Sequence, residues 1–256
     1  MVVARERWRA HPLAWIHRAE ARAIARELGA ALVEYPDLPG ERALLRLSDP
    51  VMRRIIGEIQ SPYYGPGRDA LERCYDKIQA YRIVSHAGFD IPETFLGDSQ
   101  ALPQAPFVVK PRRGSDSIGV RIASDVAPSK RNVDHLVQAR IIGHEITIAL
   151  FRDQVGVPFR ILVPPGEIYS FSGKYLFRPG RLPLEDEALR DRARRIGQAL
   201  GVDWAARVDF IVEEKSKRAY FLECDAAPLV GPDSAWAASF LAGGVDRKRQ
   251  LEWLVS

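Results

Sequence analysis

Residues 207–234 read RVDFIVEEKSKRAYFLECDAAPLVGPDS, with short apolar runs on either side of a charged turn at 213–218. This pattern predicts a β-hairpin. Because side chains alternate between the two faces of a strand, Glu223 and Asp225 should share one face, and pairing can bring Asp209 beside them. Carboxylates on one face repel one another unless a cation lies between them, and such hard oxygen ligands suit Mg²⁺. A solvated hairpin with ordinary surface acids is the alternative, and this segment alone does not decide between the two.

The overall composition is that of a globular protein. The chain has 256 residues, of which 46% are hydrophobic and 27% are charged. It is long enough for one large domain or for two or three small lobes. No apolar run approaches the roughly 20 residues that span a bilayer. The N-terminus also lacks the apolar segment of a secretory signal, so we expect a cytoplasmic protein with no membrane partner.

The charge balance is basic, with a net charge of +4, and arginine supplies 30 of the 37 basic residues. A basic excess can indicate nucleic-acid binding. Here the arginines alternate with acids, as in residues 185–195, which favours solvated helix faces and predicts no nucleic-acid partner. Cys74 and Cys224 show no CxxC pattern, so we expect neither a disulfide framework nor a zinc site. Cys224 lies on the strand face opposite the acids, which predicts a buried thiol.

Periodicity and turn residues predict a chain of alternating helices and strands. Residues 1–65 form a small α/β lobe in this interpretation, too short for a complete doubly wound domain. Helices are expected at 12–29, 50–60, 69–88, 133–139, 185–200, 234–242 and 246–254. Strands are expected at 31–35, 43–47, 107–110, 120–124, 145–151, 155–163, 168–172, 208–212 and 219–224, and residues 61–67 are expected to be a linking loop.

Two loops have compositions that suit ligand binding. The segment KPRRGSDSIGV, residues 110–120, lies between two expected strands and lacks the residue order of a Walker A motif. Its backbone N–H groups and the hydroxyls of Ser115 and Ser117 can still cradle a phosphate, and Lys110 adds charge from the strand end. A plain hairpin loop is the alternative. The basic and aromatic segment SGKYLFRPGRLP, residues 172–183, suits a mobile loop that closes over a ligand.

Six motifs, in this order, together resemble the ATP-grasp superfamily, and most closely its D-alanine–D-alanine ligase branch. They are DK…AG…P at 76–92, VVKPRRGSDSIGV at 108–120, IIGHEITIAL at 141–150, GKY at 173–175, RVDF at 207–210, and LECDAAP at 222–228 with the later Ser234. The resemblance implies an α/β (α+β) ATP-grasp fold, in which two α+β lobes grip ATP behind a small, truncated, substrate-side α/β lobe. The ATP-grasp domain would cover 66–256, with a central lobe at about 90–150 and a C-terminal metal-binding lobe at about 151–256.

The resemblance also implies a role for each matching residue. The phosphates of ATP would be held by Lys77, Lys110, Lys174 and the loop residues Gly114, Ser115, Asp116 and Ser117. The adenine would lie against Gln138, Arg140 and Ile141, and the ribose against Glu145. Two Mg²⁺ ions would be held by Asp209, Glu223 and Asp225. The catalytic residues would be Arg207, which stabilises charge on the transferring phosphoryl group, Lys174, and Ser234, which holds a substrate carboxylate.

The implied activity is ATP-dependent ligation of a carboxylate to an amine through an acyl phosphate, with release of ADP and phosphate. Phosphoryl transfer needs positioning and charge neutralisation from the protein, which suits the lysines, Arg207 and the acids. The partners would be a small amino acid, peptide or amine, and a homodimer is left open. The alternatives are an ATP-grasp kinase of a small molecule and a nucleotide-binding regulatory protein without turnover.

The chain departs from those ligases at several positions. Asp225 replaces the usual Asn of the metal motif, Gln138 replaces a Glu that contacts adenine, and Asp116 replaces a Ser of the phosphate loop. The N-terminal GG-x-S-x-E signature is absent. With the shortened first lobe, these departures point to an acceptor other than D-alanine.

Overall fold

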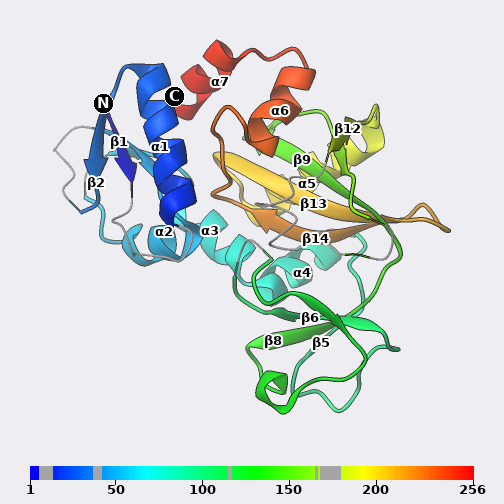
Figure 1. The fold of residues 1–256 in the computed structure, drawn as a ribbon. Coiled ribbons are helices and arrows are strands. Elements are labelled where there is room, and N and C mark those ends of the chain that lie inside the picture. Colours follow the sequence, from blue (N-terminus) through cyan, green and yellow to red (C-terminus); the bar gives the residue numbers. More distant parts are fainter. Residues whose placement is uncertain (6–13, 37–41, 61, 115–116, 165–166, 168–179) are drawn as a thin grey trace.

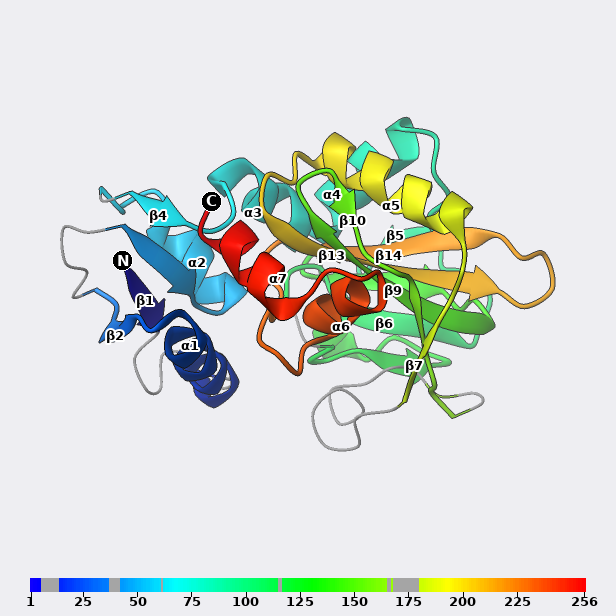
Figure 2. The ribbon, with the colours of Figure 1, turned by 90° about the horizontal axis from the view of Figure 1, so that it is seen from above.

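The computed structural model describes residues 1–5, 14–36, 42–60, 62–114, 117–164, 167 and 180–256, and its strands form three sheets (Figure 1). The first sheet has the order β2-β1-β3-β4, the central sheet β5-β8-β6-β7, and the third sheet β12-β11-β9-β13-β14, with β10 also paired to β9. Figure 2 shows the first sheet at one end of the molecule and helix α7 between it and the third sheet. None of the helices in these described ranges has the length and apolar character that crossing a bilayer requires.

The first sheet is parallel and carries a helix on each face. Val3 and Leu44 pack with the helix α1, whereas Val2 and Leu45 on the other face pack with α2. Burial on both faces explains why the strands are continuous apolar runs. Its elements are β1 (Val2–Arg5), α1 (Ala14–Leu28), β2 (Ala31–Glu34), β3 (Ala43–Arg46), α2 (Asp49–Ile55) and β4 (Tyr63–Tyr64).

Two expectations for this part of the chain were wrong. The helix α2 ends at Ile55, not near residue 60. The expected linker at 61–67 contains β4, which pairs with β3 and so extends the first sheet.

The helices α3 (Arg68–Tyr75) and α4 (Lys77–His86) replace the single helix expected at 69–88. Asp76 separates them in an extended conformation, and its carboxylate accepts hydrogen bonds from the N–H groups of Ile78 and Gln79. An acidic residue at this position caps the start of the second helix. The new helix begins at Lys77, whose Nζ donates to the carbonyl of Gly114.

The central sheet is antiparallel and comprises β5 (Thr94–Leu96), β6 (Phe107–Pro111), β7 (Arg121–Ala123) and β8 (His135–Ala139), with the 3₁₀ turn η1 (Pro128–Lys130) before β8. The expected helix at 133–139 was therefore wrong. Residues 135–139 are too few to show a helical period, and pairing with a strand on either side makes them the middle of the sheet. Gln138 consequently projects from a strand and not from a helix.

Two neighbouring connections attach the central sheet to the rest of the chain. One is the segment 87–93 between α4 and β5, and the other is 140–142 between β8 and β9. The N–H of Ala139 donates to the carbonyl of Glu93 at 2.8 Å, so the two connections lie side by side. The strand β9 then pairs with β13, so residues 143–150, which we expected in the central lobe, belong to the third sheet.

The third sheet is antiparallel, and its two faces differ in character. Val208 and Phe210 point to a buried face covered by α4 and α5, whereas Arg207 and Asp209 point to the other. The strands are β9 (Gly143–Phe151), β10 (Gln154–Val155), β11 (Phe159–Ile161), β12 (Arg181–Pro183), β13 (Ala205–Glu213) and β14 (Ala219–Asp225). The helices are α5 (Glu187–Leu200), α6 (Ala235–Ala242) and α7 (Arg247–Leu254).

The predicted hairpin is confirmed as β13 and β14, with Asp209 opposite Glu223 and Arg207 opposite Asp225. The strand expected at 155–163 forms two shorter pieces, β10 and β11. The strand expected at 168–172 lies outside the described residues, as does most of the 172–183 loop. The described end of that loop forms β12, which pairs with β11.

Candidate active site

A cavity of about 330 Å³ lies between the central sheet and the polar face of the third sheet. Its size is in the range of small-molecule and cofactor sites. The residues around it come from α4, β6, β8, the described residues of the 114–120 loop, the 139–142 connection (140–142 with the last residue of β8), β9, β11, β13 and β14. The predicted site residues that line it are Lys77, Lys110, Gly114, Ser117, Gln138, Arg140, Ile141, Glu145, Asp209 and Glu223.

Lys110 lies at the buried end of β6 and is held by two hydrogen bonds. Its Nζ donates to the Tyr81 hydroxyl at 2.7 Å and to Gln138 Oε1 at 2.8 Å. Burial lowers the pKa of Lys110 to about 8, against the opposing effect of the negative charges of Glu223 and Glu145. Lys110 is therefore a cation whose charge is poorly compensated within the protein, as a phosphate-binding lysine should be.

Gln138 and Tyr81 form the support of this lysine. Gln138 Nε2 donates to Thr94 Oγ1 at 2.8 Å and to the Tyr81 hydroxyl at 3.1 Å. The Tyr81 hydroxyl in turn donates to the carbonyl of Leu222 at 2.9 Å. Because an ammonium group has only donors, the amide oxygen of Gln138 must face Lys110. The adenine contact expected of that oxygen would thus be shared with the lysine.

Lys77 and Asp76 attach the phosphate-loop segment to the start of α4. Lys77 Nζ donates to the carbonyl of Gly114 at 2.7 Å and lies 3.9 Å from Glu223 Oε2. The carboxylate of Asp76 accepts hydrogen bonds from Arg112 and Arg113, at 2.9 Å each. Burial opposes ionisation of Asp76, but the hydrogen bond and charge of Arg112 outweigh it and lower the pKa of this carboxyl group. The loop therefore begins from a fixed, charged anchor.

The hairpin presents Arg207 between two carboxylates. Its Nε donates to Asp209 Oδ1 at 3.1 Å, and its Nη2 lies 3.1 Å from Asp209 Oδ2 and 3.8 Å from Asp225 Oδ2. Burial opposes the charge of Arg207, but Asp209 and Asp225 raise its pKa. Thr147 Oγ1 donates to Asp209 Oδ1 at 2.7 Å from the neighbouring strand β9. Asp209 is thus oriented by two donors on the polar sheet face.

The three predicted metal ligands share that face but do not form one cluster. Among the described residues, no three His, Cys, Asp or Glu side chains are grouped in a way that could hold a metal ion. Asp209 and Glu223 both line the main cavity. Asp225 lines a smaller adjoining cavity of about 20 Å³ together with Arg207, and its Oδ1 accepts from the N–H of Ala227 at 3.0 Å. Asp209 and Glu223 are carboxylates of the kind that suits Mg²⁺, so the donor chemistry fits the ion.

Four predicted site residues remain. Ser234 caps α6, its Oγ accepts from the N–H of Ala237 at 3.0 Å, and it lines neither cavity. Lys174, Ser115 and Asp116 lie outside the described residues, so the structure does not place them.

Several contributors to the site were not predicted, among them two residues that support cavity side chains and one that lines the cavity. Tyr81 lies one helical turn after Lys77, and this i, i+4 spacing on one helix face is a signal that the sequence does contain. Thr147 follows Glu145 by two residues on the same strand face. Arg160, on β11, also lines the main cavity, and no motif in the sequence indicated it.

The comparisons with known proteins agree with this geometry. Residues 74–227 match the model of the ATP-grasp domain family. The D-alanine–D-alanine ligase of Desulforudis audaxviator is 30% identical over 240 residues, which cover 81% of this chain and 76% of that protein. That of Syntrophotalea carbinolica is 31% identical over 189 residues, 65% of this chain and 60% of that protein, so the match spans less than two thirds of that relative's length.

Among solved structures, the D-alanine–D-alanine ligase from Bacillus anthracis complexed with ATP superposes with a TM-score of 0.77 at 19% identity, covering 99% of this chain and 94% of that chain. At this identity the likeness shows the fold. The chain therefore belongs to the ATP-grasp family, and the predicted fold is confirmed. Within that family it is similar to the D-alanine–D-alanine ligases.

Proposed function

We propose that this protein is an ATP-dependent ligase that joins the carboxylate of an amino acid or peptide to an amine. The observation that carries the proposal is one cavity in which Lys77 and Lys110 face Asp209 and Glu223, with Arg207 beside the acids. Cations on one wall and metal-type carboxylates on the other are what a nucleoside triphosphate with Mg²⁺ requires. The similarity to proteins named D-alanine–D-alanine ligases supports the reaction class.

The nucleotide would occupy the main cavity. Lys77 and Lys110 would bind its phosphates, the 139–142 connection would contact the adenine, and Glu145 would accept hydrogen bonds from the ribose hydroxyls. Asp209 and Glu223 would hold Mg²⁺, which neutralises phosphate charge when bound, and Asp225 would complete a two-ion site only by turning from its bond to Ala227. Lys174 and the loop residues Ser115 and Asp116 are part of the proposal through their motifs alone.

The reaction proceeds in two balanced steps. A carboxylate oxygen attacks the γ-phosphorus of ATP, the bond to the β–γ bridging oxygen breaks, and ADP leaves. The amine nitrogen then attacks the carbonyl carbon of the acyl phosphate, the carbon–oxygen bond to phosphate breaks, and the nitrogen loses a proton. Arg207 lies beside Asp209, where its fixed charge would stabilise the phosphoryl group during transfer. Ser234 would act on the substrate carboxylate only if the loop before α6 turned it from its capping bond.

The experiment is a pairwise screen of amino acids, D-alanine included, with ATP and Mg²⁺. We expect ADP and phosphate release that requires both a carboxylate and an amine, and a product whose mass is the sum of the two minus water. Starting from a carboxylate labelled with ¹⁸O, one label should appear in the released phosphate. Release of ADP with a hydroxyl acceptor and no amine would identify a kinase instead, and ATP binding without turnover would identify a regulatory protein.

Charge-removing variants connect this activity to the cavity. Lys110→Met and Asp209→Asn should each lower turnover by at least about 100-fold, because each removes a charge aimed at the phosphates or their ions. Lys248→Met is the matched control, since Lys248 is exposed on α7 and lines neither cavity. Turnover that survives both cavity substitutions would place the chemistry elsewhere.

A further inference from the structure

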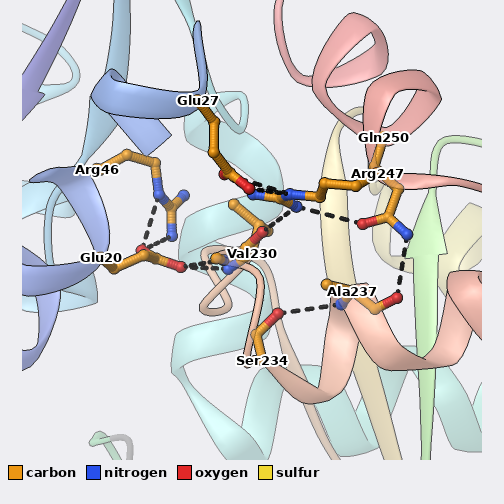
Figure 3. A network of polar contacts seen from close by, with 9 residues as sticks. Glu20, Glu27, Arg46, Val230, Ser234, Ala237, Arg247 and Gln250 are labelled. Atoms are coloured by element: carbon orange, nitrogen blue, oxygen red, sulfur yellow. Dashed lines mark hydrogen bonds and ion pairs between the residues drawn. The ribbon is translucent and has the colours of Figure 1, made fainter. Parts of the chain in front are cut away.

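A buried ion pair joins the first lobe to the loop that follows the hairpin. Arg46 on β3 donates through Nε and Nη2 to Glu20 Oε2 on α1, at 3.0 and 2.7 Å (Figure 3). The side chain of Arg46 is 0% exposed and that of Glu20 is 6% exposed. Removing two charges from water costs free energy that an apolar pair would not incur. The position of this pair therefore points to a task other than simple stabilisation.

Both side chains of the pair also bond to the backbone of residues 226–234, which we call the hairpin-exit loop. Glu20 Oε1 accepts the N–H of Val230 and, at 2.7 Å, the N–H of Gly231. Arg46 Nη2 donates to the carbonyl of Pro228 at 2.6 Å. Two successive backbone N–H groups form a natural anion-binding concavity, and here a carboxylate of the first lobe fills it. The loop is thus held by side chains far away in the sequence.

A second charged pair from the same helix supports the first. Glu27 on α1 pairs with Arg247 on α7 at 2.6 Å, and Arg247 Nη1 donates to the carbonyl of Val230 at 2.8 Å (Figure 3). Both backbone groups of Val230 are therefore bonded to charged side chains. Gly231 permits the close approach, because a Cβ at this position would lie 3.0 Å from Glu20 Cγ.

The other end of the hairpin-exit loop reaches the charged face of the hairpin. The loop begins directly after Asp225, and the N–H of Ala227 donates to the carboxylate of that residue. Asp225 and Ala226 line the smaller cavity with Arg207, on the side of the hairpin away from the 139–142 connection. If a nucleotide fills the main cavity, the molecule that reacts with its γ-phosphate lies on the side of Arg207 and this loop.

We propose that Glu20 and Arg46 are positioning residues that fix the hairpin-exit loop as the acceptor-side wall of the site. The first lobe then controls binding of the amine or carboxylate substrate without contacting ATP. This inference rests on the proposed ligase function for its kinetic consequence, whereas the attachment of the loop to Glu20 does not depend on it.

The kinetic test uses Glu20→Gln with the substrate pair that the screen identifies. A glutamine amide offers one oxygen, so it cannot accept from both Arg46 and the loop amides, and one side is left facing an NH₂ group. We expect the KM for the amino acid substrates to rise by about tenfold or more while the KM for ATP stays within about twofold, as expected for loss of a charge-assisted hydrogen bond at one end of the site. An equal rise in both KM values, or no rise for the amino acids, would overturn the proposal.

The control and the second variant separate positioning from simple destabilisation. Glu34→Gln removes the ion pairs of Glu34 with Arg18 and Arg5, which lie within the first lobe, and should leave both KM values unchanged. Gly231→Ala disturbs the same contact from the loop side. It should likewise raise the KM for the amino acids and leave the KM for ATP unchanged, and it provides the test if Glu20→Gln does not fold.

Hydrogen exchange of the ligand-free protein tests the attachment of the hairpin-exit loop to Glu20, whether or not the protein is a ligase. The amides of Val230 and Gly231 should exchange at least about tenfold faster in Glu20→Gln than in the unaltered protein, while those of the central sheet stay unchanged. Faster exchange without any ligase activity would refute the function and keep the attachment. Unchanged exchange in residues 226–234 would refute the attachment itself.

Discussion

The two ends of the main cavity are held in place by different parts of the chain. At the lysine end, Lys110, Tyr81, Gln138 and Thr94 form a network of hydrogen bonds that contains a single charged group. All four come from α4 and the central sheet, within one stretch of about sixty residues. These four residues are close in sequence, and the Tyr81 hydroxyl also bonds to the Leu222 carbonyl on the distant strand β14.

At the hairpin end, oppositely charged side chains pair with one another, and the residues that hold them in place are distant in the sequence. Arg207 lies between Asp209 and Asp225, and the hairpin-exit loop behind them is attached to Glu20, more than two hundred residues earlier. The lysine end thus depends on mostly uncharged partners close in sequence, whereas the hairpin end depends on contacts with the first lobe. Substitutions at the two ends should therefore affect different ligands.

The largest effect expected at the lysine end is a pH dependence of ATP binding that comes from Lys110. With a pKa of about 8, the lysine is charged below pH 8 and neutral above it. Since the phosphates bind the charged form, ATP affinity should be nearly constant below about pH 7 and fall by about tenfold per pH unit above 8. Calorimetric titration of ATP without acceptor, between about pH 6.5 and 9.5, measures this. Lys110→Arg keeps its charge throughout and should lose the slope, whereas a flat profile for the unaltered protein would contradict the assignment.

Tyr81→Phe should have a smaller effect, confined to the same end. The change removes one acceptor each from Lys110 and Gln138, and the donor to the Leu222 carbonyl. A lost buried hydrogen bond of this kind costs about 1 kcal/mol, so the ATP Kd should rise by about fivefold. Tyr220→Phe is the matched control, because Tyr220 lies on β14 outside both cavities. Equal effects of the two substitutions would show that Tyr81 acts on stability and not on Lys110.

The smallest effects should come from two threonines, one at each end. Thr94→Val removes an acceptor for Gln138, and Thr147→Val removes a donor to Asp209. We expect Thr94→Val to raise the ATP Kd by a few-fold with little change in kcat, and Thr147→Val to lower kcat by a similar factor with little change in Kd. Steady-state kinetics and titration of both variants make the comparison. If both variants changed Kd and kcat in the same way, the two ends of the cavity would not be independent.

Periodicity in the sequence was enough to predict the hairpin and its shared polar face. Strand alternation places Asp209, Glu223 and Arg207 together whatever the rest of the fold does, and the register confirms it. The same reasoning failed for residues 133–139, where residues 135–139 pair with β6 and residues 136–138 pair with β5, so that tertiary contacts outweigh local preference. It also missed the break at Asp76, because a capping carboxylate inside a helical pattern looks like any exposed acid.

Contacts between distant elements could not be predicted from the pattern of the chain. Glu20 lies in an amphipathic helix, where an acid reads as a solvated residue, and only the packed fold shows it buried against Arg46. Cys74 and Cys224, far apart in the sequence, are both buried and line the same small cavity. Neither was expected to meet the other, since no local spacing relates them.

The side-by-side connections of the central sheet have a thermodynamic consequence. If the covalent connections, which lie along one line, acted as a hinge, the sheet would rotate about that line, and the bonds of Asp76 to Arg112 and Arg113 and of Tyr81 to Lys110 would oppose the rotation. Arg140 and Ile141 lie on this line and also line the cavity, so a molecule that bridges Lys110 and Asp209 would touch the axis and both moving sides. Such a molecule would become part of the scaffold. Stopping the rotation would cost free energy, and this cost would reduce the measured affinity. The contacts in the cavity would therefore be stronger than a dissociation constant indicates.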